Sequence, residues 1–396
     1  MRTAWSHTGQ TLPPYAGAAT LSGRTGPSSR HRLRTWVIAC VGVLGLAVCG
    51  LGLVSTYEST LGTRVLLLSV ALAVLPLGIV IPTFLWLDRF EAEPTRYLVL
   101  AFVWGAVVAA FLASIFNTGA LLVARAVTDP QSAVSTVAVT VAPFVEEGLK
   151  GLLVLLIWWF ARREFDGITD GLVYGGICAA GFAFTENVVY LGRAYAEHGT
   201  TLLEATFIIR CVLSPFAHPM FTALTGIGIG VAATSGRRLV RVGAPVLGYL
   251  CAAFAHAMFN LAAMVAGRGL LTVYLLVEVP VFVAFVSLIV WARRHEGRLI
   301  GQFLRPYAAF GWLAPAEVTM LASMSRRRDA RIWARANGGR RALVAMRAFQ
   351  DAASELALLR RRMYHETADS RAVLEERRLL DTLVREREQF IGQRIA

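Results

Sequence analysis

Two adjacent glutamates and a lysine interrupt a long apolar stretch of the chain. Glu146 and Glu147 are followed by Lys150 at spacings of four and three residues, which bring the ammonium group near each carboxylate if the stretch is helical. A charge at the centre of a membrane-spanning helix costs about 2.5–3.5 kcal/mol, so such residues are usually paired or functional. One carboxylate can pair with the ammonium group, which leaves the other as a candidate general base.

Lys150 is distinctive because all the other basic residues, out of 39 in total, are arginines. A buried lysine can lose its proton, whereas arginine essentially cannot. We therefore expect Lys150 to act directly in a site. The alternative is a plain ion pair that neutralises one glutamate so that the helix can enter the membrane.

Further polar side chains fall inside the apolar stretches that follow. Glu186 and His218 lie in separate stretches, and His256 and Asn260 share a helical face at spacing i, i+4. A lone histidine in a membrane helix is usually a helix–helix hydrogen bonder, but two histidines near three glutamates and a lysine favour a functional site. Arg210 is either a counter-ion of Glu186 or a residue near the membrane interface.

Eight segments are apolar and long enough to span a bilayer, which takes about 20 residues. They are 36–55, 65–87, 97–124, 133–160, 168–192, 201–233, 243–266 and 270–292. Arginines precede the first segment and gather in alternate loops, so the positive-inside rule places both termini in the cytoplasm of a multi-pass cell-membrane protein. Pro143 predicts an irregular turn in the fourth segment, and Pro215 and Pro219 predict a kink or break in the sixth.

The expected fold is all-α: a polytopic membrane protein of about eight transmembrane helices with a helical cytoplasmic tail. Residues 1–35 are basic and rich in Gly, Ser and Pro, which indicates disorder. Residues 36–292 form the membrane domain, with its core at 133–266. Residues 293–396 form an Arg-rich tail of amphipathic helices. The arginines of this tail either contact anionic lipid headgroups or form solvated faces, and we expect solvated faces.

The amino-acid composition of the chain also indicates a membrane protein. The chain is 56% hydrophobic and 16% charged, whereas a soluble domain carries about 25% charged residues. Its net charge of +13 would suggest nucleic acid in a soluble protein, but basic residues also collect in the cytoplasmic parts of membrane proteins, so we expect no nucleic-acid partner. The five cysteines form no C-x-x-C pair, which argues against a disulfide framework or a thiolate metal site.

With these residues in this order, the sequence resembles the PrsW family of intramembrane proteases, relatives of the CAAX-processing and bacteriocin-immunity proteases. Four motifs on successive predicted spans carry the resemblance. They are Glu146-Glu147-x-x-Lys150, Phe182-x-x-x-Glu186 with Asn187, His218, and His256-x-x-x-Asn260. The resemblance covers roughly residues 65–295 and leaves the N-terminal extension and the tail outside.

The resemblance implies hydrolysis of a peptide bond within the bilayer. The substrates would be single-span or membrane-tethered proteins, such as anti-sigma factors, surrounded by membrane lipids. Glu146 or Glu147 would polarise a water as general base, and Lys150 would bias the ionisation of this pair. Asn260 would donate a hydrogen bond to the developing oxyanion.

The two histidines leave the question of a metal open. His218 and His256 either donate to the oxyanion or, with Glu186, form a two-histidine, one-carboxylate set that suits Zn²⁺ with an open water position. No Ser or Cys nucleophile motif is visible, and no other cofactor is indicated.

Two other classes of function are weighed against a protease. Buried Glu, His and Lys are common in proton relays, which would suit a proton-coupled transporter, but the halves of the chain show no internal repeat. A catalytically inactive scaffold would bind other membrane helices and keep its function after Glu147→Gln.

Overall fold

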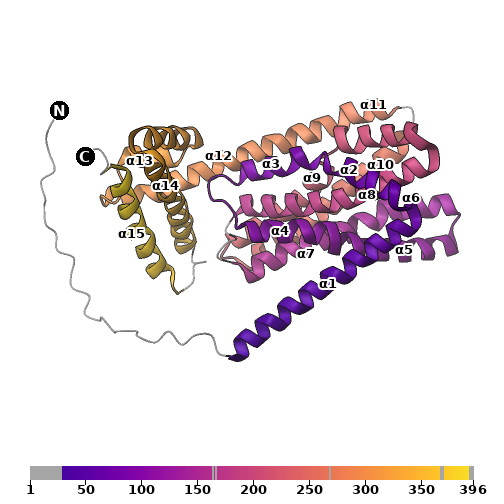
Figure 1. Cartoon of the computed structure of the whole chain (residues 1–396), viewed down its shortest axis with the longest axis horizontal. Helices are drawn as coiled ribbons and strands as arrows, with labels where there is room; N and C mark the ends of the chain where they lie inside the picture. Colours follow the sequence, from indigo (N-terminus) through magenta and orange to yellow (C-terminus); the bar gives the residue numbers. More distant parts are fainter. Residues whose placement is uncertain (1–28, 163–164, 166, 267–268, 366–369, 392–396) are drawn as a thin grey trace, which may run out of the picture. The chain divides into compact units, whose positions relative to one another are not determined.

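A computed structural model describes residues 29–162, 165, 167–266, 269–365 and 370–391. These residues are almost entirely helical and contain no strand, which confirms the expected all-α class (Figure 1). Residues 48–396 form one compact unit. Most of the expected disordered extension, residues 1–28, lies outside the described residues, while helix α1 already begins at Ser29.

The helices of the first part of the chain largely follow the predicted spans. They are α1 (Ser29–Leu61), α2 (Thr63–Val74), α3 (Leu77–Leu87), α4 (Thr95–Val103), the π-helical turn η1 (Trp104–Ala109), α5 (Ala110–Val127), α6 (Pro130–Thr140), α7 (Ala142–Phe160), α8 (Ile168–Phe207), the π-helical turn η2 (Ile208–Leu213), α9 (Ala217–Ala233) and α10 (Arg238–Ala266). A third π-helical turn, η4 (Tyr274–Glu278), joins the short α11 (Leu270–Val273) to α12 (Val279–Ala309).

Six helical stretches within the described residues are long and apolar enough to cross a membrane. They are Val41–Leu61, Thr63–Leu87, Thr95–Val127, Ile168–Ala233, Arg238–Val265 and Leu271–Ala309. The stretch Ile168–Ala233 has 66 residues and is kinked at His198 and Gly199. Helix α7, with its three charged residues, is outside these six. The count of eight spans and the cytoplasmic termini therefore stay predictions.

The prolines break the helices where the sequence predicts irregularity. Val141 separates α6 from α7, and Pro143 follows in the first turn of α7, where its missing N–H is not needed. Residues 214–216 interrupt the helical run before α9, which begins at Ala217. His218 consequently lies in the first turn of a new helix.

Glycines allow the backbone of α8 to contact the backbones of neighbouring helices directly. A Cβ on Gly171 would lie 2.0 Å from the carbonyl oxygen of Gly226 in α9, and a Cβ on Gly226 would lie 2.0 Å from the carbonyl oxygen of Gly171. On another side of α8, a Cβ on Gly105 of η1 would lie 1.9 Å from the carbonyl oxygen of Cys178. Such close approaches are typical of small residues at membrane helix interfaces.

The loop between α3 and α4 is fixed by buried carboxyl groups. The Asp88 carboxylate accepts a hydrogen bond from the backbone N–H of Glu93 (2.9 Å), and the hydroxyl of Tyr174 in α8 donates to the Glu93 carboxyl group (2.5 Å). Burial raises the pKa of Asp88 to about 7, and burial together with the nearby Asp170 charge raises the pKa of Glu93 to about 12. Burial therefore favours the neutral form of the Glu93 carboxyl group.

Helix α12 crosses the boundary expected at residue 293 and continues without a break to Ala309, so this domain boundary stays a prediction. It is followed by α13 (Pro315–Leu321), α14 (Met324–Tyr364) and α15 (Ala372–Ile391). These helices share an apolar core that includes Leu304, Phe349 and Leu356. Helix α14 bends at Gly338 and Gly339, where Gly339 has a φ of 64°.

We expect Gly226→Ala to lower the free energy of unfolding by about 1–3 kcal/mol, because the new methyl group collides with the α8 backbone. Thermal unfolding of the purified chain in detergent measures this effect. The matched control is Gly119→Ala, since Gly119 is also helical but has no atom within 4 Å of the added Cβ. Equal melting temperatures for wild type and Gly226→Ala would contradict the close packing of α8 and α9.

Candidate active site

Glu147 of α7 is fully buried and satisfied on both oxygens. Its Oε1 accepts from Lys150 Nζ at 2.5 Å and lies 3.0 Å from His256 Nδ1, while Oε2 accepts from Thr222 Oγ1 at 2.7 Å. Three side chains from α7, α9 and α10 thus converge on one carboxylate. A carboxylate with this many partners holds other groups in place and has little capacity left for a reacting molecule.

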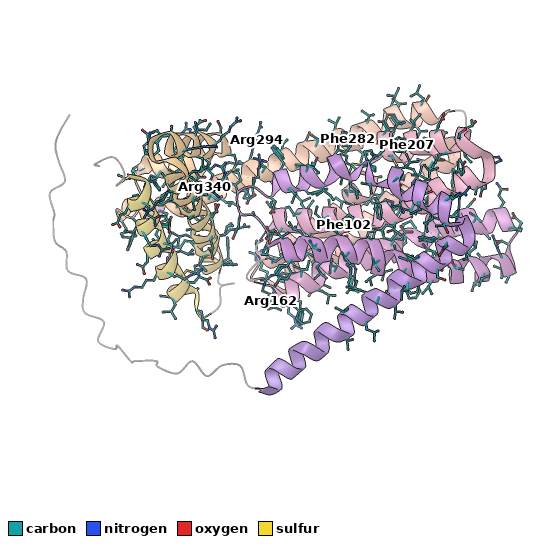
Figure 2. All side chains as sticks on the ribbon, viewed as in Figure 1. Phe102, Arg162, Phe207, Phe282, Arg294 and Arg340 are labelled. Carbon is teal, nitrogen blue, oxygen red and sulfur yellow. The ribbon has the colours of Figure 1, made fainter. Side chains whose placement is uncertain are left out.

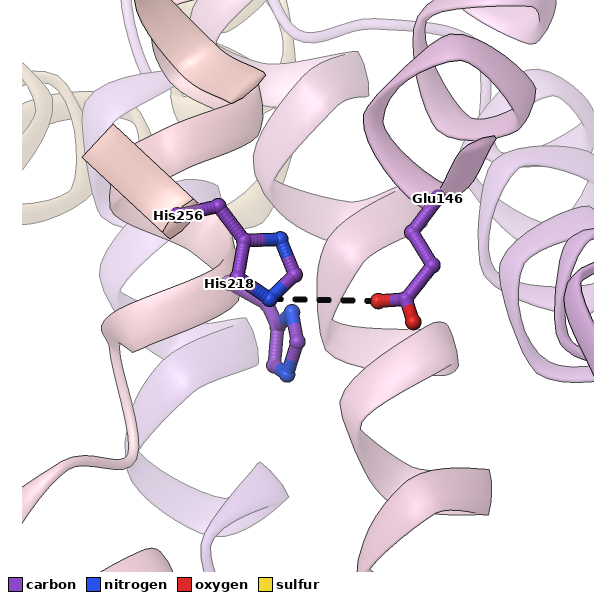
Figure 3. A group of neighbouring side chains, drawn as sticks. All are labelled: Glu146, His218 and His256. Atoms are coloured by element: carbon purple, nitrogen blue, oxygen red, sulfur yellow. Dashed lines mark ion pairs between the residues drawn. The ribbon is translucent and has the colours of Figure 1, made fainter. Parts of the chain in front are cut away.

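Glu146 has the opposite environment, although it is the next residue and is also buried. Its Oε1 accepts from Asn117 Nδ2 of α5 at 3.1 Å. Its Oε2 has no hydrogen-bond partner among the described residues and lies 3.9 Å from His256 Nε2 (Figure 3). Glu146 therefore presents a carboxylate oxygen to the space in front of His256.

The contacts of His256 determine which ring nitrogen carries its proton. Its Nδ1 lies 3.0 Å from Glu147 Oε1, so Nδ1–H donates and Nε2 keeps its lone pair. This Nε2 points toward the unpartnered Oε2 of Glu146. The Phe221 ring stacks on the imidazole with centroids 5.0 Å apart, which restrains the orientation of His256.

His218 is held between a cation and an anion. Lys150 Nζ lies 3.2 Å from Nδ1, and Glu186 Oε2 lies 2.8 Å from Nε2. An ammonium group has only donors, so Nδ1 accepts and Nε2–H donates to Glu186. Lys150 also lies 4.3 Å from the centroid of the Phe182 ring, a cation–π contact.

Glu186 and Arg210 form an ion pair, which confirms one of the two expectations for Arg210. The Nη2 of Arg210 lies 2.7 Å from Glu186 Oε2, and its Nε donates to Asn187 Oδ1 at 2.9 Å. The guanidinium carbon lies 4.0 Å from the centroid of the Tyr190 ring. Arg210 therefore neutralises Glu186 within the membrane-spanning part of the chain.

Glu146, His218 and His256 together could hold a metal ion. Each offers one ligand atom, and these atoms lie within 4.8 Å of one another. The fit is best at His256 Nε2 and Glu146 Oε2, two electron-pair donors that face each other with no hydrogen bond between them. Two histidines and a carboxylate suit Zn²⁺. The lone pair of His218 Nδ1 is directed at Lys150 in this structure.

The carboxylate in this set differs from the one expected from sequence. Glu186 contacts Nε2 of His218 instead, and Glu147 contacts Nδ1 of His256. Carboxylates in such positions orient metal-binding imidazoles and fix their tautomers.

Asn260 lies at the edge of the site. Its Nδ2 donates to the carbonyl oxygen of Ala138 at 2.8 Å. Together with His218 and Arg210 it lines a cavity of about 290 Å³. A second, mostly apolar cavity of about 420 Å³ shares lining residues with the first, among them Ser214 and Glu278.

Two residues of the cluster were not predicted as site residues. Asn117 is one of four asparagines in the chain and lies inside an apolar stretch, but nothing in the sequence linked it to Glu146. Thr222 had no such signal, because threonine is common in apolar helices, and only the packing of α9 on α7 brings it to Glu147.

The part of the chain that contains this cluster is similar to known proteins. The family described as "PrsW family intramembrane metalloprotease" matches residues 93–289. The chain is 30% identical over 193 residues to Protease PrsW of Clostridioides difficile (strain 630), which covers 48% of the chain and 78% of that protein. It is 27% identical to Protease PrsW of Geobacillus kaustophilus (strain HTA426), over 39% of the chain and 63% of that protein.

A third relative, Protease PrsW of Bacillus subtilis (strain 168), is 33% identical over 22% of the chain and 37% of its own length. No solved structure matches the chain. The matched residues 93–289 include every residue of the cluster around Glu146 and Glu147. The chain belongs to the PrsW family of intramembrane metalloproteases, which are hydrolases.

Proposed function

We propose that this chain hydrolyses a peptide bond of a single-span or membrane-tethered protein, with Glu146, His256 and His218 at the reacting centre. The observation that carries the proposal is the buried Glu146 Oε2, which has no hydrogen-bond partner among the described residues and lies 3.9 Å from His256 Nε2. A cation or a proton-bearing reactant at this place would satisfy the buried oxygen. A regulator of the anti-sigma type fits the substrate class that the resemblance implies.

Glu146, His218 and His256 would hold a divalent metal such as Zn²⁺. When bound, such a metal polarises the scissile carbonyl and makes water a stronger nucleophile at neutral pH. His218 joins this set when the flexible Lys150 side chain leaves Nδ1 and stays with Glu147.

Two carboxylates position the imidazoles. Glu147 accepts from His256 Nδ1–H and holds Nε2 toward Glu146. Glu186 accepts from His218 Nε2–H and is itself neutralised by Arg210. Lys150 balances the charge of Glu147 through a direct 2.5 Å ion pair.

The two neighbouring cavities, which share lining residues, suit an unwound stretch of substrate. A membrane helix must lose its internal hydrogen bonds to expose a peptide bond, and in lipid the freed groups need new partners. The 290 Å³ cavity provides Asn260, Arg210, Ser214 and Glu278. We assign the oxyanion contact to the Asn260 amide and the side chain of a neighbouring substrate residue to the 420 Å³ apolar cavity.

The first test is the pair Glu146→Gln and Glu204→Gln in liposomes that contain a library of single-span substrates. Glu146→Gln should lower cleavage at least about 100-fold, because an amide group cannot act as a general base or as a carboxylate ligand. Its melting temperature should stay near that of wild type, since the Gln carbonyl can still accept from Asn117. Glu204 is exposed on α8 and serves as the matched control. Wild-type cleavage by Glu146→Gln would overturn the assignment.

The second test concerns the metal. Purified wild-type chain should contain stoichiometric zinc or another divalent metal by elemental mass spectrometry, and His256→Ala should contain almost none. A chelator should stop cleavage, and added metal should restore it. Cleavage that survives complete removal of metal would contradict the metal proposal and leave Glu146 as a metal-free general base.

The third test fills the apolar cavity. Ala262→Trp should lower kcat/KM about tenfold for substrates with Phe or Leu beside the cleaved bond and leave Ala substrates nearly unchanged. Leu261→Trp is the control, because Leu261 is exposed and lines neither cavity. An equal loss with all substrates would show that the cavity does not select a side chain.

A further inference from the structure

Five arginines, four from the tail and one from the loop between α3 and α4, line one groove. The groove has a volume of about 460 Å³. Its lining residues are Arg89, Met324, Arg328, Arg331, Ile332, Arg335, Leu343 and Arg347. None of the lining residues is acidic. The groove therefore combines a strongly positive wall with a smaller apolar part.

The bend in α14 builds most of this groove. Arg327 Nη2 donates to Ser354 Oγ at 2.5 Å, and Gln350 Nε2 donates to the carbonyl oxygen of Arg327 at 3.0 Å. These contacts place the two halves of α14 side by side around Gly338 and Gly339. Arg347 comes from the second half of this hairpin.

In the first half of α14, helical spacing places three of the arginines on one face. Arg328, Arg331 and Arg335 follow one another at intervals of three and four residues, so their side chains share one face. Met324 continues the same face one turn earlier. These residues all line the groove.

The side chains of the five arginines make no hydrogen bond or ion pair within the part of the chain that the structure describes. Burial and the nearby charges of Arg347 and Arg89 lower the pKa of Arg331. The charge of Asp351, which does not line the groove, offsets only part of this effect on Arg331. Five like charges therefore converge in a groove that has no acidic lining residue.

Some other arginines of the tail are paired with carboxylates. Arg387 Nη2 lies 2.7 Å from Glu317 Oε2, and Arg360 Nη1 lies 3.5 Å from Glu376 Oε1. The chain thus has carboxylates available for its tail arginines and places none of them in the groove.

The groove lies next to the end of a membrane span. Arg89 is two residues beyond Leu87, where the candidate span Thr63–Leu87 ends. The loop that carries Arg89 is fixed by the Asp88–Glu93 hydrogen bond, and Arg327 Nη1 donates to the carbonyl oxygen of Phe90 at 3.1 Å. The tail hairpin and the end of α3 are therefore joined by a direct contact.

We propose that this groove binds the phosphate headgroup of an anionic phospholipid. Guanidinium groups bind phosphate oxygens with paired N–H donors, and basic residues beside a membrane span attract anionic lipids. The apolar side chains of Met324, Ile332 and Leu343 suit the part of the lipid next to its headgroup. The groove lies outside the family match at residues 93–289, so this inference is independent of the proposed proteolysis.

The test measures binding of dioctanoyl phosphatidylglycerol to the full-length chain in a neutral detergent by native mass spectrometry. Dioctanoyl phosphatidylcholine is the neutral comparison lipid. The variant Arg331→Gln/Arg335→Gln should bind phosphatidylglycerol roughly 30-fold more weakly than wild type, about fivefold for each charge removed.

The matched control is Arg340→Gln/Arg341→Gln, which removes two exposed charges from the same hairpin without touching the groove; Arg340 is labelled in Figure 2. It should bind phosphatidylglycerol as wild type does. Equal weakening in both variants would mean diffuse attraction and overturn the site, and so would wild-type binding by Arg331→Gln/Arg335→Gln.

Two competitors test the source of the anion. Inorganic pyrophosphate should displace phosphatidylglycerol only at much higher concentration, because it lacks the apolar part. Displacement at equal concentration would identify a free phosphate site instead. Stronger displacement by a hexaglutamate peptide would replace the lipid with an acidic protein segment. Either result would overturn the proposal.

Discussion

Inside a bilayer no water is available to pair a polar group, so every buried charge must find its partner within the protein. Lys150 meets this requirement for much of the site. Its ammonium group contacts Glu147 Oε1, His218 Nδ1 and the face of Phe182. By donating to His218 it places the proton of that imidazole on Nε2, toward Glu186. By pairing with Glu147 it keeps that carboxylate ionised as the acceptor for His256. One cation thus governs the orientation of both histidines.

This arrangement explains why a lysine occupies the position in a chain that otherwise uses arginine. A guanidinium is planar and keeps its charge, whereas an ammonium group on a flexible chain can donate in three directions from one point. Removing one member of a buried pair leaves an uncompensated charge, which is strongly destabilising. The cluster is therefore a single unit of structure as well as of chemistry.

The sequence was sufficient for the residue types and the helical class, because charges in apolar stretches are too costly to be accidental. It was not sufficient to separate the roles of Glu146 and Glu147. Neighbouring residues on a helix point about 100° apart, and what each one meets depends on other helices. Thr222 of α9 and Asn117 of α5 decide that Glu147 is satisfied and that Glu146 keeps a free oxygen. Likewise, no local pattern revealed that α12 runs past residue 293.

The need of buried charges for partners also distinguishes arginine inside the membrane from arginine in the tail. Arg210 lies in a membrane-spanning segment and is paired with Glu186, as the absence of water demands. Exposed arginines in the tail need no partner, because water solvates them, so a lack of ion pairs alone says little there. The informative feature is that several arginine side chains lie close together. Bringing like charges together opposes folding, and the hairpin of α14 nevertheless directs Arg328, Arg331 and Arg347 to one groove at the end of a span. A bound anion would offset this repulsion.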